Sequence, residues 1–178
     1  MIRETGEEDQ REKELKRAKN AAYRLLTYRP RSRKELEDKL GEKEYPDDVI
    51  RSVIEHCSGL GYINDAAFAA QWAAGRVRSR CFGRRRIEQE LRSKGIERDI
   101  IREALAGAVP PEDELAAARR AAVKKLRTMR SVEPNILKRR LAGFLERKGF
   151  QSEIIWSLVS ALVRTSGQLG SDHDSESS

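Results

Sequence analysis

The sequence predicts an all-α fold in which three tandem three-helix repeats form an elongated, curved helical body. Charged residues make up 37% of the 178 residues and aromatic residues only 6%, a balance that favours long solvated helices. Alternating apolar runs are absent, and glycine and proline fall at expected helix ends. Five apolar positions also recur three times in one register, as expected of repeats that mainly contact their neighbours.

The middle helix of each repeat is marked by two apolar residues four positions apart, such as Leu36 and Leu40, which share one helix face. Further apolar positions follow at the same spacing, and the repeats are offset by 51 and 54 residues. The corresponding residues are Leu36, Ile87 and Leu141; Leu40, Leu91 and Leu145; Tyr45, Ile96 and Phe150; Val49/Ile50, Ile100/Ile101 and Ile154/Ile155; and Ile54, Leu105 and Val159.

The last two helices of each repeat are expected to be joined by a short turn. Lys94-Gly95 and Lys148-Gly149 end the middle helix of the second and third repeats, because glycine readily takes the left-handed conformation after a helix. The first repeat has Lys43-Glu44 at that place, so its turn is expected to differ. The third helices are expected to start near Pro46-Asp47, Glu97-Arg98 and Gln151-Ser152.

A more apolar helix is expected before each of these pairs. Asp65 is the expected N-cap of the second such helix, and the two prolines in AGAVPPED (106–113) predict a linker. These first helices are expected over residues 18–26, 66–77 and 115–129. The predicted domains are a charged N-terminal extension (1–16), three-helix repeats at 17–65, 66–109 and 110–164, and a disordered acidic, serine-rich tail (165–178).

Composition excludes several classes of protein. No run of 18 apolar residues could span a membrane, and the charged N-terminus lacks the apolar segment of a signal peptide. Cys57 and Cys81 belong to no CxxC or Cys/His cluster, so we expect free thiols in a cytoplasmic protein.

No catalytic constellation is found. His56 neighbours Cys57, but a Cys/His nucleophile needs an orienting group, so both are interpreted as a helix end packed near the core. The other histidine, His173, falls in the tail, and no glycine-rich phosphate loop is present. We therefore expect no enzymatic activity, no catalytic, cofactor-binding or metal site, and no cofactor.

The net charge of +7 is unevenly distributed. Residues 1–16 carry four basic and six acidic side chains, and residues 165–178 carry three acids and no lysine or arginine. The segment between them has a charge of +12, which attracts polyanions.

Two stretches concentrate the basic residues. Residues 76–86 contain six arginines and no acid, and residues 119–140 contain nine basic residues and one acid, Glu133. A solvated face would carry balancing acids, so a binding ridge is favoured over a merely soluble surface. Phe82 is the only aromatic residue in either stretch, so contacts with phosphates or an acidic protein surface fit better than base reading.

Motifs in the middle of the chain carry a family resemblance. They are GYIND (61–65), FA (68–69), Trp72, Arg76, Gly83, RIEQEL (86–91) and KGI (94–96). With these motifs the chain resembles the RecX family of bacterial recombinase regulators, and the likeness covers about Ala18 to Leu162. The family's fold, tandem three-helix repeats, agrees with the periodicity.

The resemblance implies that the protein modulates, and mainly inhibits, the RecA recombinase. RecX-like proteins bind the RecA filament on single-stranded DNA and restrain its growth, strand exchange, ATP hydrolysis and the coprotease activity behind the SOS response. The implied partners are this filament and DNA phosphates, with no membrane and no cofactor, and the chain is expected to be a monomer.

Three hypotheses for the basic stretches stay open. They form a docking face for the RecA–DNA filament, or the chain is a stand-alone, non-specific DNA-binding protein whose affinity falls steeply with salt, or it is a scaffold for an unrelated partner. Arg76 matches the family motif, and the other contacts are inferred from charge. The expected contact residues are Arg76, Arg80, Arg84, Arg85, Arg86, Lys124, Lys125, Arg139 and Arg140.

Overall fold

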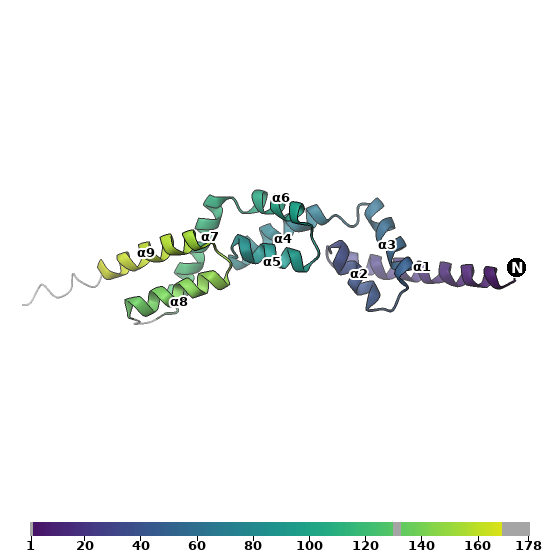
Figure 1. Ribbon diagram of the computed structural model, residues 1–178, viewed down its shortest axis with the longest axis horizontal. Coiled ribbons are helices and arrows are strands. Elements are labelled where there is room, and N and C mark those ends of the chain that lie inside the picture. Colours follow the sequence, from purple (N-terminus) through teal and green to yellow (C-terminus); the bar gives the residue numbers. More distant parts are fainter. Residues whose placement is uncertain (1, 130–132, 169–178) are drawn as a thin grey trace, which may run out of the picture. The chain divides into compact units, whose positions relative to one another are not determined.

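The computed structural model describes residues 2–129 and 133–168, which form nine α-helices and no strand (Figure 1). The helices are α1 (Ile2–Tyr28), α2 (Arg33–Gly41), α3 (Asp47–Gly59), α4 (Asp65–Arg80), α5 (Arg84–Ser93), α6 (Arg98–Ala108), α7 (Pro111–Leu126), α8 (Pro134–Arg147) and α9 (Ser152–Gln168). The all-α prediction is confirmed, with three helices in each repeat. None of the helices in these ranges is long and apolar enough to cross a membrane.

The repeated apolar positions lie in the interior. Both positions of every middle helix are 0% exposed, from Leu36 and Leu40 in α2 to Leu141 and Leu145 in α8. The later positions are buried or half-buried, and Phe150, at the turn before α9, is 1% exposed. The register predicted from sequence therefore marks core positions in all three repeats.

The compact bodies of the chain differ from its sequence repeats. The chain divides into unit 1, residues 1–71 with 91–102, and unit 2, residues 72–90 with 103–178. The division passes through α4, α5 and α6, so the helices of the second repeat are shared between the two units.

Unit 1 is built around the first three helices. α1 packs against α2 and α3 through Ala18 and Ala22, which are both fully buried. Because alanine side chains are short, the three helices approach closely at these positions. Cys57 of α3 lies in the same core at 0% exposure, as expected for a packed helix end.

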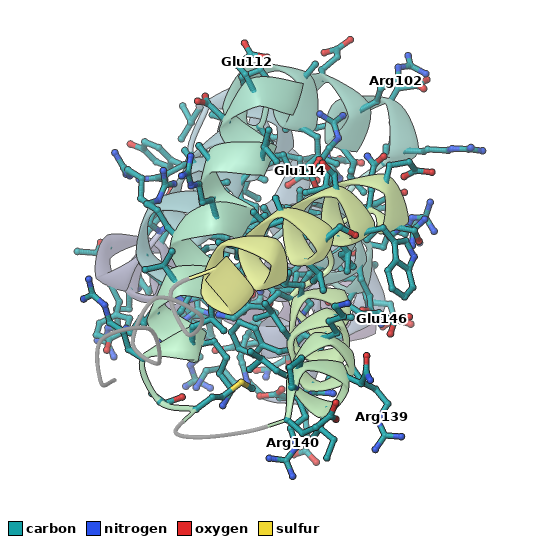
Figure 2. All side chains as sticks on the ribbon, turned by 90° about the vertical axis from the view of Figure 1, so that its left-hand side faces the viewer. Arg102, Glu112, Glu114, Arg139, Arg140 and Glu146 are labelled. Atoms are coloured by element: carbon teal, nitrogen blue, oxygen red, sulfur yellow. The ribbon has the colours of Figure 1, made fainter. Side chains whose placement is uncertain are left out.

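Unit 2 contains the last three helices, in which α8 packs against α9 and both pack against α7. α7 turns a stripe of alanines inward, including Ala118 and Ala122 at 0% exposure. Figure 2 shows this part of the chain, with Glu112 pointing outward from the start of α7 and Glu114 directed between the helices. The opposite face of α7 carries its arginines and lysines.

The turn after the middle helix has the same conformation in all three repeats. Gly95 and Gly149 have φ of 75° and 84°, and Glu44 takes the equivalent place with φ of 61°. The Glu44 N–H donates to the Gly41 carbonyl at 2.8 Å, as the equivalent N–H groups do in the other two repeats. The prediction of a different turn in the first repeat is wrong, because the surrounding backbone bonds impose the left-handed conformation on a glutamate.

The predicted cap of α4 is also wrong by one residue. The Asn64 side chain accepts the Ala67 N–H at 2.9 Å and so caps the helix. Asp65 is the first helical residue, and its carboxylate accepts the Arg33 N–H instead.

Several helix limits differ from the prediction, most of all in α1, which begins at Ile2 rather than at residue 18. α7 begins at Pro111 rather than at residue 115, since proline suits the first helical position. α9 continues through Gln168, four residues into the predicted disordered tail. The rest of that tail, residues 169–178, lies outside the described residues, as does Arg130 of the second basic stretch.

Candidate functional site

The start of α2 is tied to the second repeat inside unit 1, in a contact region that we call joint 1. The Ser32 hydroxyl donates to the Lys94 carbonyl at 2.7 Å, and the Arg33 N–H donates to the Asp65 carboxylate at 2.8 Å. The carboxylate and the hydroxyl satisfy the N–H groups at the start of α2, which have no partner within the helix.

The start of α5 is tied to the third repeat in the same way inside unit 2, and we call this region joint 2. The Gly83 N–H donates to the Lys148 carbonyl at 2.9 Å, and the Arg84 N–H donates to Glu114 at 3.0 Å. In the repeat register, Arg84 corresponds to Arg33 and Lys148 to Lys94. The two joints are therefore built on one plan.

Glycine is required in joint 2 by the approach of two backbones. A Cβ on Gly83 would lie 2.4 Å from the Gly149 carbonyl oxygen, and a Cβ on Gly149 would lie 2.3 Å from the Arg86 nitrogen. Neither neighbour is a flexible side chain, so no larger residue fits at either position without moving the backbone. Gly83, part of the family resemblance, thus has a structural role.

Arg84 is also part of the scaffold of joint 2. Its guanidinium donates to the carbonyls of Leu105 and Val109, the latter at 2.6 Å, and so satisfies the end of α6. Glu114, its backbone partner, is 1% exposed. Burial raises the pKa of the Glu114 carboxyl, and the Arg84 N–H bond opposes this rise.

Arg76 is held in a second intramolecular cluster. Its guanidinium lies 2.6 Å from the Glu90 carboxylate and 4.1 Å from the centre of the Trp72 ring. The Trp72 indole N–H donates to the same carboxylate at 3.0 Å, and Arg86 pairs with it at 3.5 Å. Two of the arginines predicted to contact a partner, Arg76 and Arg84, therefore hold helices of this chain together.

Joint 1 balances its charges internally. The Glu35 carboxylate bonds Lys94 at 2.5 Å and Arg29 at 3.0 Å, and the carboxylate and the lysine are each 17% exposed. Burial alone would raise the pKa of Glu35, but the hydrogen bonds from Arg29 and Lys94 lower it to about 2.

Joint 2 keeps the cations and lacks the acid. Arg80 and Lys148 correspond to Arg29 and Lys94, but the position of Glu35 is taken by Arg86. The Lys148 ammonium donates to the Arg80 carbonyl at 2.7 Å. Burial lowers the pKa of Lys148, Cys81 opposes this, and the charges of Lys124 and Arg80 lower it further. Within residues 2–129 and 133–168, no ion pair joins Arg80, Lys124 or Lys148 to a carboxylate.

These cations line a hollow of about 350 Å³ on unit 2, which we call the basic groove. Its lining consists of Ser79, Arg80, Cys81, Arg120, Ala121, Lys124, Lys125, Thr128, Phe144 and Lys148. A second hollow of about 540 Å³ shares Lys125 and Thr128 with the groove and is otherwise lined by Met129, Arg139, Arg140, Gly143 and Arg147. Figure 2 shows Arg139 and Arg140 pointing outward from α8.

The structure thus brings together five of the nine predicted contact residues. They are Arg80, Lys124, Lys125, Arg139 and Arg140. Arg85 is exposed on α5, and its N–H donates to the Gly149 carbonyl at 3.1 Å. Sequence reasoning missed Arg120, Arg147 and Lys148 as site residues. Arg120 stands in the second basic stretch, whereas Lys148 was interpreted only as a helix end.

His56 of α3 contacts a side chain of α1. His56 Nε2 lies 2.8 Å from the Tyr23 hydroxyl, and burial raises the pKa of the neighbouring Cys57 thiol. Cys57 and Cys81 are both free cysteines. Over the part of the chain that the structure describes, no group of three or more His, Cys, Asp or Glu side chains could hold a metal ion.

Comparisons with known proteins place the chain in a family. Models of the first, second and third three-helix domains of RecX match residues 18–57, 64–105 and 112–159. The chain belongs to the RecX family. The resemblance stated from the sequence is confirmed, and the three domains follow one another in the order of the repeats.

Similar proteins cover most of the chain. "Regulatory protein RecX" of Mycolicibacterium smegmatis is 39% identical over 147 residues, which are 80% of this chain and 78% of that protein. The protein of the same name from Thermobifida fusca is 35% identical over 151 residues, or 85% of this chain and 81% of that protein. The crystal structure of RecX from Lactobacillus salivarius superposes with a TM-score of 0.74 at 27% identity, covering 84% of this chain and 97% of that one.

Proposed function

We propose that this protein modulates, and mainly inhibits, RecA by binding its filament on single-stranded DNA. Binding restrains filament growth, strand exchange, ATP hydrolysis and coprotease activity. The proposal is carried by the three RecX domains, which match in order and span most of the chain. It assigns the protein to the cytoplasm, as a monomer that needs no cofactor and catalyses no reaction.

The basic surface of unit 2 supports an anionic partner. Five of the predicted contacts line two adjoining hollows. Among the described residues, no carboxylate forms an ion pair with Arg80 or Lys124. A filament of RecA on DNA presents phosphates and acidic side chains, both of which such cations attract. In this proposal Arg85 and Arg86 extend the contact surface. Arg76 and Arg84 do not contact the partner and hold in place the helices that carry this surface.

The test is the ATPase activity of RecA on single-stranded DNA, titrated with this protein at physiological salt. We expect inhibition at ratios far below one protein per RecA, because a filament regulator acts on many subunits at once. Binding to the same DNA without RecA is measured in parallel. Inhibition that begins only when the DNA itself is coated would overturn the proposal and favour a stand-alone DNA-binding protein.

A pair of variants assigns the effect to the basic surface. Arg139→Ala with Arg140→Ala removes two exposed cations from the second hollow, and we expect inhibition to need several-fold more protein. Lys43→Ala with Arg51→Ala removes two exposed cations from the first repeat and serves as the charge-matched control. Equal losses in the two variants would mean that net charge alone matters.

A further inference from the structure

The two joints differ at one position in a way that points to a missing counter-charge. In joint 1, Glu35 neutralises Arg29 and Lys94. Joint 2 repeats the two cations as Arg80 and Lys148 and replaces the acid by Arg86. The same scaffold therefore carries a satisfied ion-pair network in one place and an unbalanced cluster of cations in the other.

Lys148 is the half-buried cation of joint 2, and Arg80 and Lys124, which line the same groove, are exposed. The Lys148 ammonium is fixed by the Arg80 carbonyl and lies 5.0 Å and 5.6 Å from the ring centres of Phe82 and Phe144. An ammonium has three N–H donors, and the bond to the Arg80 carbonyl leaves two for another acceptor. An outside anion would relieve the repulsion among these cations as Glu35 does in joint 1.

The two hydroxyl groups that line the groove already donate to carbonyls of the chain, so its lysines and arginines are the groups that would bind an anion. Ser79 donates to the Gly75 carbonyl at 2.7 Å, and Thr128 donates to the Lys125 carbonyl at 2.7 Å. Because both hydroxyl protons are used within the chain, an anion in the groove is held mainly by lysine and arginine. Recognition of this kind suits phosphates and carries no base specificity.

We propose that the basic groove is a subsite for a backbone phosphate of single-stranded DNA, held by Arg80, Lys124 and Lys148 in the place that Glu35 fills in joint 1. The adjoining hollow with Arg139, Arg140 and Arg147 continues the cationic surface, which suits a chain of phosphates better than one isolated anion. The inference rests on the proposed function for its biological setting, since it names the chemical group of the filament that the groove would contact.

The first test measures binding of the full-length protein to fluorescein-labelled dT30 by anisotropy, between 50 and 200 mM KCl. Lys124→Ala removes an exposed lysine of the groove, and we expect about five-fold weaker binding and a salt slope shallower by ~0.7. Lys43→Ala removes an exposed lysine of the first repeat and should leave both quantities nearly unchanged. Equal effects of the two substitutions would overturn the subsite.

The second test rebuilds joint 1 inside joint 2. Arg86→Glu places a carboxylate where Glu35 stands in joint 1, so that it competes with phosphate for Lys148. Arg86→Gln removes the same arginine without adding an acid and is the matched control. We expect Arg86→Glu to bind dT30 about five-fold more weakly than Arg86→Gln, at equal helix content by circular dichroism. Equal affinities of the two folded variants would contradict the inference.

A competition experiment separates nucleic acid from acidic protein. Poly-glutamate of equal charge should displace dT30 poorly, whereas unlabelled dT30 should displace it fully. Preferential binding of poly-glutamate, lost in Lys124→Ala, would overturn the phosphate assignment in favour of an acidic protein surface. The RecA ATPase is measured with the same variants. Inhibition by the wild type without groove-dependent DNA binding would sink the subsite alone, and groove-dependent binding without inhibition would sink the proposed function alone.

Discussion

In both joints a carboxylate accepts the N–H of the first helical residue, but the joints differ in how closely their chains approach and in how their charges are balanced. In joint 1, a side-chain hydroxyl of Ser32 reaches the Lys94 carbonyl, whereas in joint 2 the backbone of Gly83 itself reaches Lys148. The closer approach removes the space for a Cβ, and the loss of the acid leaves cations facing a groove. Conserving hydrogen-bond geometry between repeats thus leaves the charge of the surrounding side chains free to diverge.

The largest difference between the joints should come from alanine at the glycine of each turn. Gly149→Ala drives a Cβ to 2.3 Å from backbone, and we expect a loss of about 4 kcal/mol of stability or more. Gly95→Ala meets only the Lys34 side chain at 2.6 Å, and we expect about 2 kcal/mol. Thermal melts followed by circular dichroism check the order, and a more damaging Gly95→Ala would refute the closer approach in joint 2.

Low pH should destabilise joint 1 by protonating Glu35. Its carboxyl has a pKa of about 2 in the folded chain against an ordinary 4.5, so its stabilisation is present above pH 4.5 and is lost as the pH falls towards 2. The loss amounts to at most about 3 kcal/mol. Glu35→Gln should abolish this part of the pH dependence. Melting temperatures from pH 7 to pH 2 measure it, and parallel curves for the two proteins would contradict the ion-pair network.

Removing the carboxylate that receives the helix start should also separate the joints. Glu114→Ala leaves the Arg84 N–H without its acceptor in a buried place, and we expect a loss of about 2 kcal/mol. Asp65→Ala removes the same bond at an exposed site, where water replaces it, and we expect less than about 1 kcal/mol. Urea unfolding compares the two variants, and equal losses would show that burial does not distinguish them.

The pKa of Glu114 should give joint 2 the opposite pH response. Since burial raises this pKa, the folded chain holds the proton longer than the unfolded chain does. Stability from this group is complete below the unfolded pKa and falls as the pH rises through the folded one. Glu114→Gln, which keeps an acceptor and cannot ionise, should remove that decline in the same melts.

The smallest effect is expected at the turn of the first repeat. Glu44 has φ of 61°, which costs a residue with a side chain energy that glycine avoids. Glu44→Gly should therefore stabilise the chain by roughly 1 kcal/mol, in contrast to the losses from alanine in the other two turns. A rise in melting temperature supports this, and a fall would show that Glu44 contributes contacts of its own.

Much of the fold was predictable because local patterns decide it. The spacing of Leu36, Ile87 and Leu141 marked buried middle helices, and Gly95 and Gly149 were expected in the left-handed turn where they lie. The prediction for the turn of the first repeat was wrong because it relied on the low preference of glutamate for the left-handed conformation. Hydrogen bonds of the neighbouring backbone determine that conformation instead. The predicted cap of α4 was wrong because the Asp65 carboxylate accepts the Arg33 N–H, 32 residues earlier in the chain. Local sequence rules do not reveal a contact at that separation.

The candidate site was predictable as a composition and not as a geometry. The two basic stretches can be recognised in the sequence. The neighbouring sequence does not distinguish Arg84, which donates to carbonyls of α6, from Arg80, which lines the groove. Lys148 entered the groove only through tertiary packing. Comparing equivalent positions of the repeats could have exposed the replacement of Glu35 by Arg86, because that comparison needs only the register.

The division of the chain through α4, α5 and α6 bears on how the protein can be shortened or enlarged. A fragment cut at the borders of a single repeat keeps only one side of each joint and loses the partners of its helix starts. A pair of consecutive repeats keeps one joint whole, and only all three repeats keep both joints. A gene duplication or deletion that adds or removes a repeat must likewise copy or remove both sides of a joint. The length of such a chain should therefore change in steps of one repeat together with one joint.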